Sequence, residues 1–300
     1  MLGLAITATL GNGPRVVPIE QRRPLWLIPN LLSLDAPLVA VAWLYMFAKT
    51  WRADYLPWAA YISLGLVVWI IYAADRLIDS GLQKDSVNLE ARHEFHRRHR
   101  RFFKIALTVG SIAALVLVVL SLPVSIYGYS IIGGVLVIAF FALSVFGSQE
   151  PNELPYAKNI IAGFAFAYGT SMIAFVYTGF ETMEWLKSRE LICFSVLCIL
   201  NISAIDLWEQ AARSADLELK ATNELSLTLP LLLLAGFSLV FATQDRELST
   251  RAFFYAILTG AGLLYILNRI RQRFSSEVVR VFADVALLLP FLVFLASRRH

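Results

Sequence analysis

The residues of this sequence best suited to chemistry are two aspartates, Asp75 and Asp79, which end an apolar run that starts near Tyr55. Carboxylates four residues apart share one face of a helix. Acidic side chains at the end of a membrane helix are costly and often mark a functional site. Such a pair facing a cavity suits Mg²⁺, which binds one or two carboxylates together with substrate phosphates. In a simpler interpretation, both aspartates only end the helix and pair with Arg76 or the basic loop beyond it.

The composition of the chain indicates a membrane protein. Of its 300 residues, 58% are hydrophobic and 16% are charged, whereas soluble domains carry about 25% charged residues. The mean hydropathy is +0.65. The net charge of +4 is small, and the basic residues cluster beside the ends of apolar runs. This placement favours contact with membrane lipid or phosphate, and we expect no nucleic acid partner.

Nine apolar runs are each long enough, within a few residues, to cross the hydrocarbon core, which takes about 20 helical residues. They predict an all-α membrane protein in which nine transmembrane helices form a bundle around a central cavity. We expect residues 25–300 to form a single polytopic membrane domain and residues 1–24 to form a cytoplasmic leader. The predicted spans are roughly 28–49, 55–78, 103–122, 125–147, 158–179, 189–211, 226–243, 250–268 and 277–296.

The distribution of lysine and arginine predicts the orientation of these spans. With the N-terminus inside, 18 of the 26 basic residues fall on the cytoplasmic side and 8 on the other. Cytoplasmic loops carry the excess of positive charge in membrane proteins. We therefore expect a multi-pass protein with its N-terminus inside, in a bacterial cytoplasmic membrane.

Three further polar stretches fall on the same side as the aspartate pair. They are an arginine- and histidine-rich loop, the start of the fifth span and the end of the sixth. Their candidate residues are Arg92 in the loop, Tyr156 and Lys158 in the fifth span, and Asn201, Asp206 and Glu209 in the sixth. Each stretch also has a simpler explanation, as a topology signal, an interfacial anchor or a frayed helix end. Asp35 and Asp284 lie near the same side and are further candidates to line a pocket.

Two acidic clusters on facing helices can hold Mg²⁺, which grips a diphosphate and neutralises its charge as it leaves. Basic side chains beside the metal can bind the remaining oxygens. An allylic diphosphate would leave a stabilised carbocation, and an apolar cavity would exclude water. The predicted catalytic and metal-binding residues are Asp75, Asp79, Asp206 and Glu209, and the predicted substrate-binding residues are Lys158, Arg76, Arg92, Tyr156 and Asn201.

In motif order and helix count the chain resembles the UbiA superfamily of membrane prenyltransferases. The stretch 75–79 resembles the latter half of the family's first motif, N-D-x-x-D-x-x-x-D, although Ile71-Tyr72 stands where the motif opens with Asn-Asp. Lys158-Asn159, followed by Gly163 and Gly169, resembles the start of the family's fifth helix. Asp206 and Glu209 occupy the region of the second Asp-rich motif without its regular spacing.

The resemblance implies an Mg²⁺-dependent transferase that moves a polyprenyl group from an isoprenoid diphosphate to a lipid-soluble, aromatic acceptor within the membrane. Two alternatives remain open. One is a membrane protein that binds an isoprenoid or a partner subunit without catalysis, because part of the first motif is missing. The other is a transporter with intramembrane titrating groups such as Asp75, Asp206 and Asp284. The crowding of the acids on one side and the absence of an inverted repeat disfavour the transporter.

Overall fold

A computed structural model describes residues 28–53, 55–82, 99–146, 154–213 and 216–298. Within these residues the chain is helical and has no strand, which confirms the predicted all-α class. Three elements are short: α1 (Ile28–Leu31), α8 (Thr182–Leu186) and the 3-10 helix η3 (Arg271–Arg273). The long helices are α2 (Asp35–Thr50), α3 (Trp58–Leu82), α5 (Arg100–Ser121), α6 (Ile126–Phe146), α7 (Leu154–Val176), α9 (Arg189–Arg213), α10 (Leu217–Gln244), α11 (Leu248–Ile270) and α12 (Ser276–Ser297).

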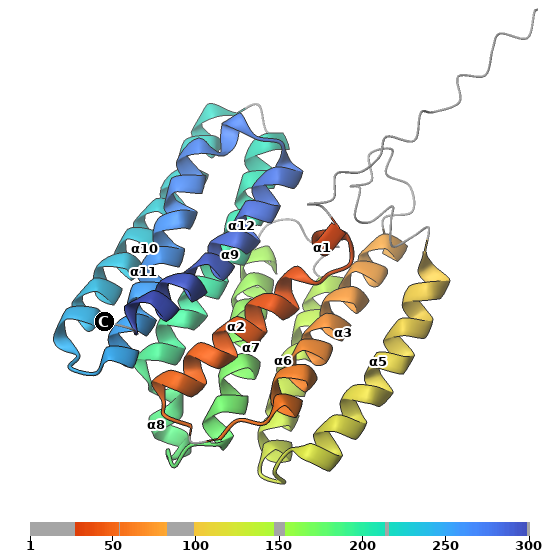
Figure 1. The fold of residues 1–300 in the computed structure, drawn as a ribbon. Coiled ribbons are helices and arrows are strands. Elements are labelled where there is room, and N and C mark those ends of the chain that lie inside the picture. Colours follow the sequence, from red (N-terminus) through yellow and green to blue (C-terminus); the bar gives the residue numbers. More distant parts are fainter. Residues whose placement is uncertain (1–27, 54, 83–98, 147–153, 214–215, 299–300) are drawn as a thin grey trace, which may run out of the picture.

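Consecutive long helices run in opposite directions and pack into one bundle (Figure 1). The ends of α3, α9 and α11 therefore lie at the same end of the bundle as the starts of α2, α7, α10 and α12. We call this the polar end, since it carries Asp75, Asp206 and Asp284. The predicted leader 1–24 and the loop with Arg92 lie outside the described residues.

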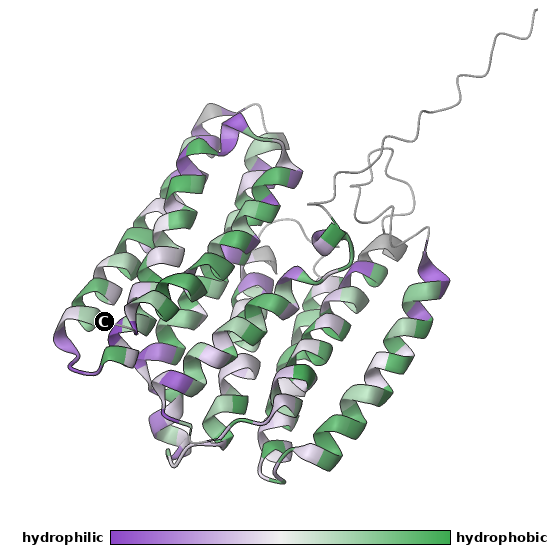
Figure 2. Ribbon diagram, viewed as in Figure 1, coloured by the Kyte–Doolittle hydropathy of each residue, from purple (hydrophilic) through white to green (hydrophobic). Residues whose placement is uncertain are grey.

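Eight helices in the described part of the chain are long and apolar enough to cross a membrane: α3, α5, α6, α7 and α9 to α12. Hydrophobic residues line the middle of these helices, and hydrophilic residues lie mainly near their ends (Figure 2). The protein is therefore a multi-pass integral membrane protein. The ninth long helix, α2, has 16 residues and spans only about 24 Å. It lies largely buried among the others, so the count of nine crossings stays a prediction.

The predicted first span, 28–49, is broken into α1 and α2 by a tight turn. Ser33 takes the left-handed conformation with φ 57°. The amide of Leu34 donates to the carbonyl of Pro29 (2.9 Å), and the amide of Ser33 donates to that of Asn30 (3.2 Å). These two bonds are those of a Schellman turn, in which glycine is the usual left-handed residue. The turn sets α1 against the polar end and leaves α2 too short for a full span.

Aromatic side chains fill the middle of the bundle around α2. The ring of Trp43 stacks on Phe194 of α9 at 4.2 Å between centroids and meets Phe253 of α11 edge-on at 5.5 Å. All three side chains are fully buried. The indole nitrogen of Trp43 also donates to the carbonyl of Leu287 in α12 (2.9 Å). Through these contacts Trp43 of α2 joins α9, α11 and α12 at the centre of the bundle.

Candidate functional site

A buried polar network joins α1, α2, α3 and α12 at the polar end. The side-chain nitrogen of Asn30 donates to the carboxylates of Asp35 (2.7 Å) and Asp284 (3.5 Å). Arg76 of α3 donates to the carbonyl of Asn30 and forms an ion pair with Asp35 at 3.7 Å. The exposed fractions of Arg76 and Asp35 are only 6% and 8%. The guanidinium that we predicted to bind substrate therefore holds α3 against α1 and α2 in this structure.

The first aspartate pair lies on α3 as predicted, with Asp75 and Asp79 one helical turn apart. Asp35 of α2 and Asp284 of α12 both accept hydrogen bonds from the side chain of Asn30, at the same end of the bundle as Asp75. Asp79 lies in α3, but its side chain is outside the described part of the structure.

A close approach of α7 and α9 positions the second acidic region. Asn159, which is 4% exposed, donates to Asp206 at 2.8 Å. One turn further along α7, a Cβ on Gly163 would lie 2.6 Å from the backbone nitrogen of Ile199. Such a contact is closer than real side chains allow, so only glycine permits this helix spacing. Gly163 therefore lets α7 and α9 approach each other closely, one turn from the hydrogen bond between Asn159 and Asp206.

The remaining predicted substrate-binding residues of α7 and α9 differ in exposure. Tyr156 is 53% exposed at the start of α7. The amino group of Lys158 lies over the ring of Phe140 in α6, 5.2 Å from its centroid. Asn201 is 5% exposed, and its side-chain oxygen makes no hydrogen bond with the described residues. These three side chains do not meet in one contact cluster.

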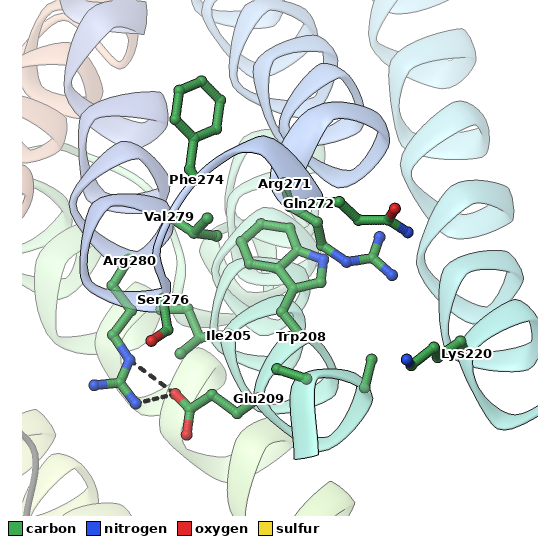
Figure 3. Close-up of a pocket in the computed structure, with 12 residues that line it drawn as sticks. Ile205, Trp208, Glu209, Lys220, Arg271, Gln272, Phe274, Ser276, Val279 and Arg280 are labelled. Carbon is green, nitrogen blue, oxygen red and sulfur yellow. Dashed lines mark hydrogen bonds and ion pairs between the residues drawn. The ribbon is translucent and has the colours of Figure 1, made fainter. Parts of the chain in front are cut away.

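Glu209 is held by an arginine of α12. The Nε of Arg280 donates to Glu209 at 2.8 Å, and a second guanidinium nitrogen also contacts the same oxygen (Figure 3). This ion pair lies at the edge of a pocket of about 390 Å³ between α9, α10, η3 and α12. Trp208, Lys220 and Arg271 also line the pocket. None of its lining residues comes from α2, α3 or α7, so it is separate from the network around Asp75.

The described side chains do not fit the predicted magnesium site. Among these residues, no three histidine, cysteine, aspartate or glutamate side chains gather as a metal-binding group. Asp206 and Glu209 are engaged by Asn159 and Arg280, whereas Mg²⁺ demands carboxylate oxygens at about 2.0–2.1 Å in octahedral geometry. We therefore derive no reaction step through a metal, and Mg²⁺ dependence stays a prediction.

The sequence interpretation overlooked several residues that the structure brings to the polar end. Asn30 was not considered, and Lys220, Arg271 and Arg280 were counted only as signals of topology. A usable signal existed for Arg280, which precedes Asp284 by one helical turn in an otherwise apolar run. Charged residues within membrane helices usually face the interior of the bundle and pair there.

Comparisons with protein-family models, curated proteins and solved structures found no match. The resemblance to the UbiA superfamily therefore stays an expectation from the motif order and the predicted helix count.

Proposed function

We propose that this protein is an enzyme that transfers a polyprenyl group from an isoprenoid diphosphate to a lipid-soluble, aromatic acceptor within the membrane. The observation that carries the proposal is that Asp75, Lys158 and Asp206 come from three different helices and lie at one end of an apolar bundle. Ionisable residues of membrane helices mark a functional site by default, and this end of the bundle brings several of them together.

In the proposed reaction, the allylic carbon–oxygen bond of the donor breaks and the diphosphate leaves with the bonding electrons. The acceptor carbon or oxygen forms the new bond to the allylic carbon and then loses a proton. Lys158 would bind the oxygens of the leaving diphosphate, because a charge-assisted bond strengthens as negative charge develops there. Apolar helix faces would hold the chain and exclude water from the carbocation.

The orientation that we propose for this reaction has the polar end in the cytoplasm of a bacterial cell. Its support is the distribution of basic residues, 18 of 26 on that side. Soluble diphosphates would then be released into the cytoplasm.

The test is release of inorganic diphosphate from donors of several chain lengths, with and without Mg²⁺. We expect Asp75→Asn and Asp79→Asn to abolish release, because each removes a charge from the pair that retains regular helical spacing. Asp206→Asn and Glu209→Gln should reduce it less. Glu218→Gln is the matched control, since Glu218 is exposed in the first turn of α10 at the same end.

Two results would contradict the proposal. One is diphosphate release that persists in both Asp75→Asn and Asp79→Asn. The other is no release by the unaltered protein from any donor with any aromatic acceptor tried.

The second candidate is a protein that binds an isoprenoid without catalysis. It is favoured by the engagement of Asp206 and Glu209 with Asn159 and Arg280, which leaves these carboxylates as structural partners. Mass spectrometry of lipids extracted from the purified protein separates the two. Intact polyprenyl diphosphate in the extract, together with no turnover, would favour the binding protein.

A further inference from the structure

The pocket between α9, α10, η3 and α12 carries an excess of positive charge. Among the described residues of its lining, three are basic, Lys220, Arg271 and Arg280, and one is acidic, Glu209. Since Glu209 binds Arg280, the charges of the other two cations are left without a counter-ion in the lining.

Arg271 is the more unusual of these cations because it is buried. It is 9% exposed, and one terminal nitrogen donates to the backbone carbonyl (2.5 Å) and side-chain oxygen (2.7 Å) of Asn268. Its other guanidinium nitrogens make no hydrogen bond with the described residues, and no described carboxylate lies within ion-pair distance. The acid that acts on it from further away, Glu224, is bound by Arg269 at 2.6 Å. A buried charge without a partner is strongly unfavourable.

Lys220 lines the same pocket. Figure 3 shows Lys220 on α10 and Arg271 on η3 in different parts of the pocket lining. Lys220 forms no ion pair within the described part of the chain. Like charges along one pocket raise its positive potential, and an anion in the pocket would be attracted by both.

The rest of the lining suits a ligand with a polar and an apolar part. Ser276 lines the pocket at the start of α12, whose N-cap residue Ser275 makes no side-chain cap hydrogen bond. The first amides of a helix point outward and favour anions. Trp208 and Phe274 supply apolar surface on the same walls. The volume of about 390 Å³ is that of a small-ligand site.

We propose that this pocket binds a phosphate monoester or diphosphate group through Arg271 and Lys220. The charge of the ligand follows from the described part of the lining, which carries two more positive than negative charges. A phosphate monoester carries about −1.5 to −2 at neutral pH and a diphosphate at least as much, so either balances this excess, whereas a carboxylate carries only one charge. The group belongs either to a membrane lipid or to a free phosphate compound. Of the residues assigned to the proposed prenyl transfer, only Glu209 lines the pocket, and it is bound by Arg280, whereas Asp75, Lys158 and Asp206 are not in the described lining.

The test is binding by the full chain in nanodiscs of phosphatidylcholine, by isothermal titration with inorganic diphosphate. The Lys158→Ala variant serves as the background, so that a site at the start of α7 does not contribute. Lys220→Gln should weaken binding about tenfold or more, as expected for a lost charge-assisted hydrogen bond. Arg273→Gln is the matched control, because it removes one positive charge from an exposed position of η3 outside the pocket. Arg271→Gln should weaken binding at least as much as Lys220→Gln, and Lys220→Gln keeps the test valid if Arg271→Gln fails to fold.

A second measurement distinguishes the source of the phosphate. Nanodiscs that contain phosphatidate, a phosphate monoester, are compared with nanodiscs that contain phosphatidylglycerol, a singly charged diester. Enrichment of phosphatidate that Lys220→Gln removes, without diphosphate binding, assigns the pocket to a lipid headgroup. Diphosphate binding that Lys220→Gln weakens assigns it to a free phosphate compound. Equal weakening by Lys220→Gln and Arg273→Gln, or no binding of either probe, would overturn the proposal. Either result leaves the diphosphate-release test of the proposed transferase unaffected.

Discussion

Alanine in place of Gly163 tests whether the close approach of α7 and α9 builds the polar end. The added Cβ would lie 2.6 Å from the backbone nitrogen and 2.7 Å from the Cα of Ile199. Neither atom can rotate away as the tip of a side chain can. The helices must therefore separate by about 0.8 Å to reach an ordinary contact of 3.4 Å. Overpacking of this kind costs about 1–3 kcal/mol, against a gain in helix propensity of about 1 kcal/mol.

The same displacement should reach the hydrogen bond between Asn159 and Asp206. Asn159 lies one turn from Gly163, and its bond to Asp206 measures 2.8 Å. An added 0.8 Å would lengthen it to roughly 3.6 Å, which is beyond hydrogen-bonding distance. Gly163→Ala should therefore lower thermal stability and also release Asp206 from its partner.

Gly169→Ala is the matched control, because a Cβ at this second glycine of α7 meets nothing within 4 Å. The measurement is the melting temperature of each purified variant in the same detergent. We expect Gly163→Ala to melt several degrees below the unaltered protein, and Gly169→Ala to melt at the same temperature or slightly higher. A Gly163→Ala protein as stable as Gly169→Ala would refute the steric reasoning.

Three further predictions concern the polar end. Asp35→Asn should lower the free energy of unfolding by about 3 kcal/mol or more, because it leaves Arg76 buried without its ion-pair partner. The double variant with Arg76→Met should recover much of this loss, and chemical denaturation measures both. Lys158→Ala should weaken diphosphate binding about tenfold or more while changing the melting temperature little; unchanged affinity would make Lys158 only an anchor. A tag inserted within 90–101 should be accessible to a membrane-impermeant reagent only from the cytoplasm, and labelling from the other side would reverse the proposed orientation.

Most helix positions could be predicted from the sequence, because a membrane-spanning helix needs a continuous run of about 20 predominantly apolar residues. The predicted spans 125–147 and 277–296 differ from α6 and α12 by one residue at most at each end. The predicted start of the span 226–243 is wrong, since α10 begins nine residues earlier, at Leu217. Its first two turns are polar and capped by Asp216, which accepts a hydrogen bond from the amide of Glu218 (2.9 Å). Hydropathy detects the part of a helix that meets lipid and misses the part beyond it.

The break between α1 and α2 could not be predicted from the sequence. No glycine or proline stands at the break, yet Ser33 adopts a left-handed conformation there within an apolar run. A serine takes this conformation at a cost of order 1–3 kcal/mol, which the surrounding structure must offset. The contacts of Asn30 with Asp35, Arg76 and Asp284 hold the turn in place, and they come from segments far apart in the chain.

The sequence by itself determined that this is a helical multi-pass membrane protein and that Asp75, Asp206 and Asp284 fall at one end of it, because both properties follow from the local spacing of apolar and charged residues. Only the tertiary structure decided what those residues contact. Arg76 pairs with Asp35, and Arg271 donates to Asn268 rather than to a described carboxylate. Whether a charge is paired depends on which helices pack together and at what distance. That arrangement depends on contacts such as Gly163 against Ile199, which no local pattern encodes.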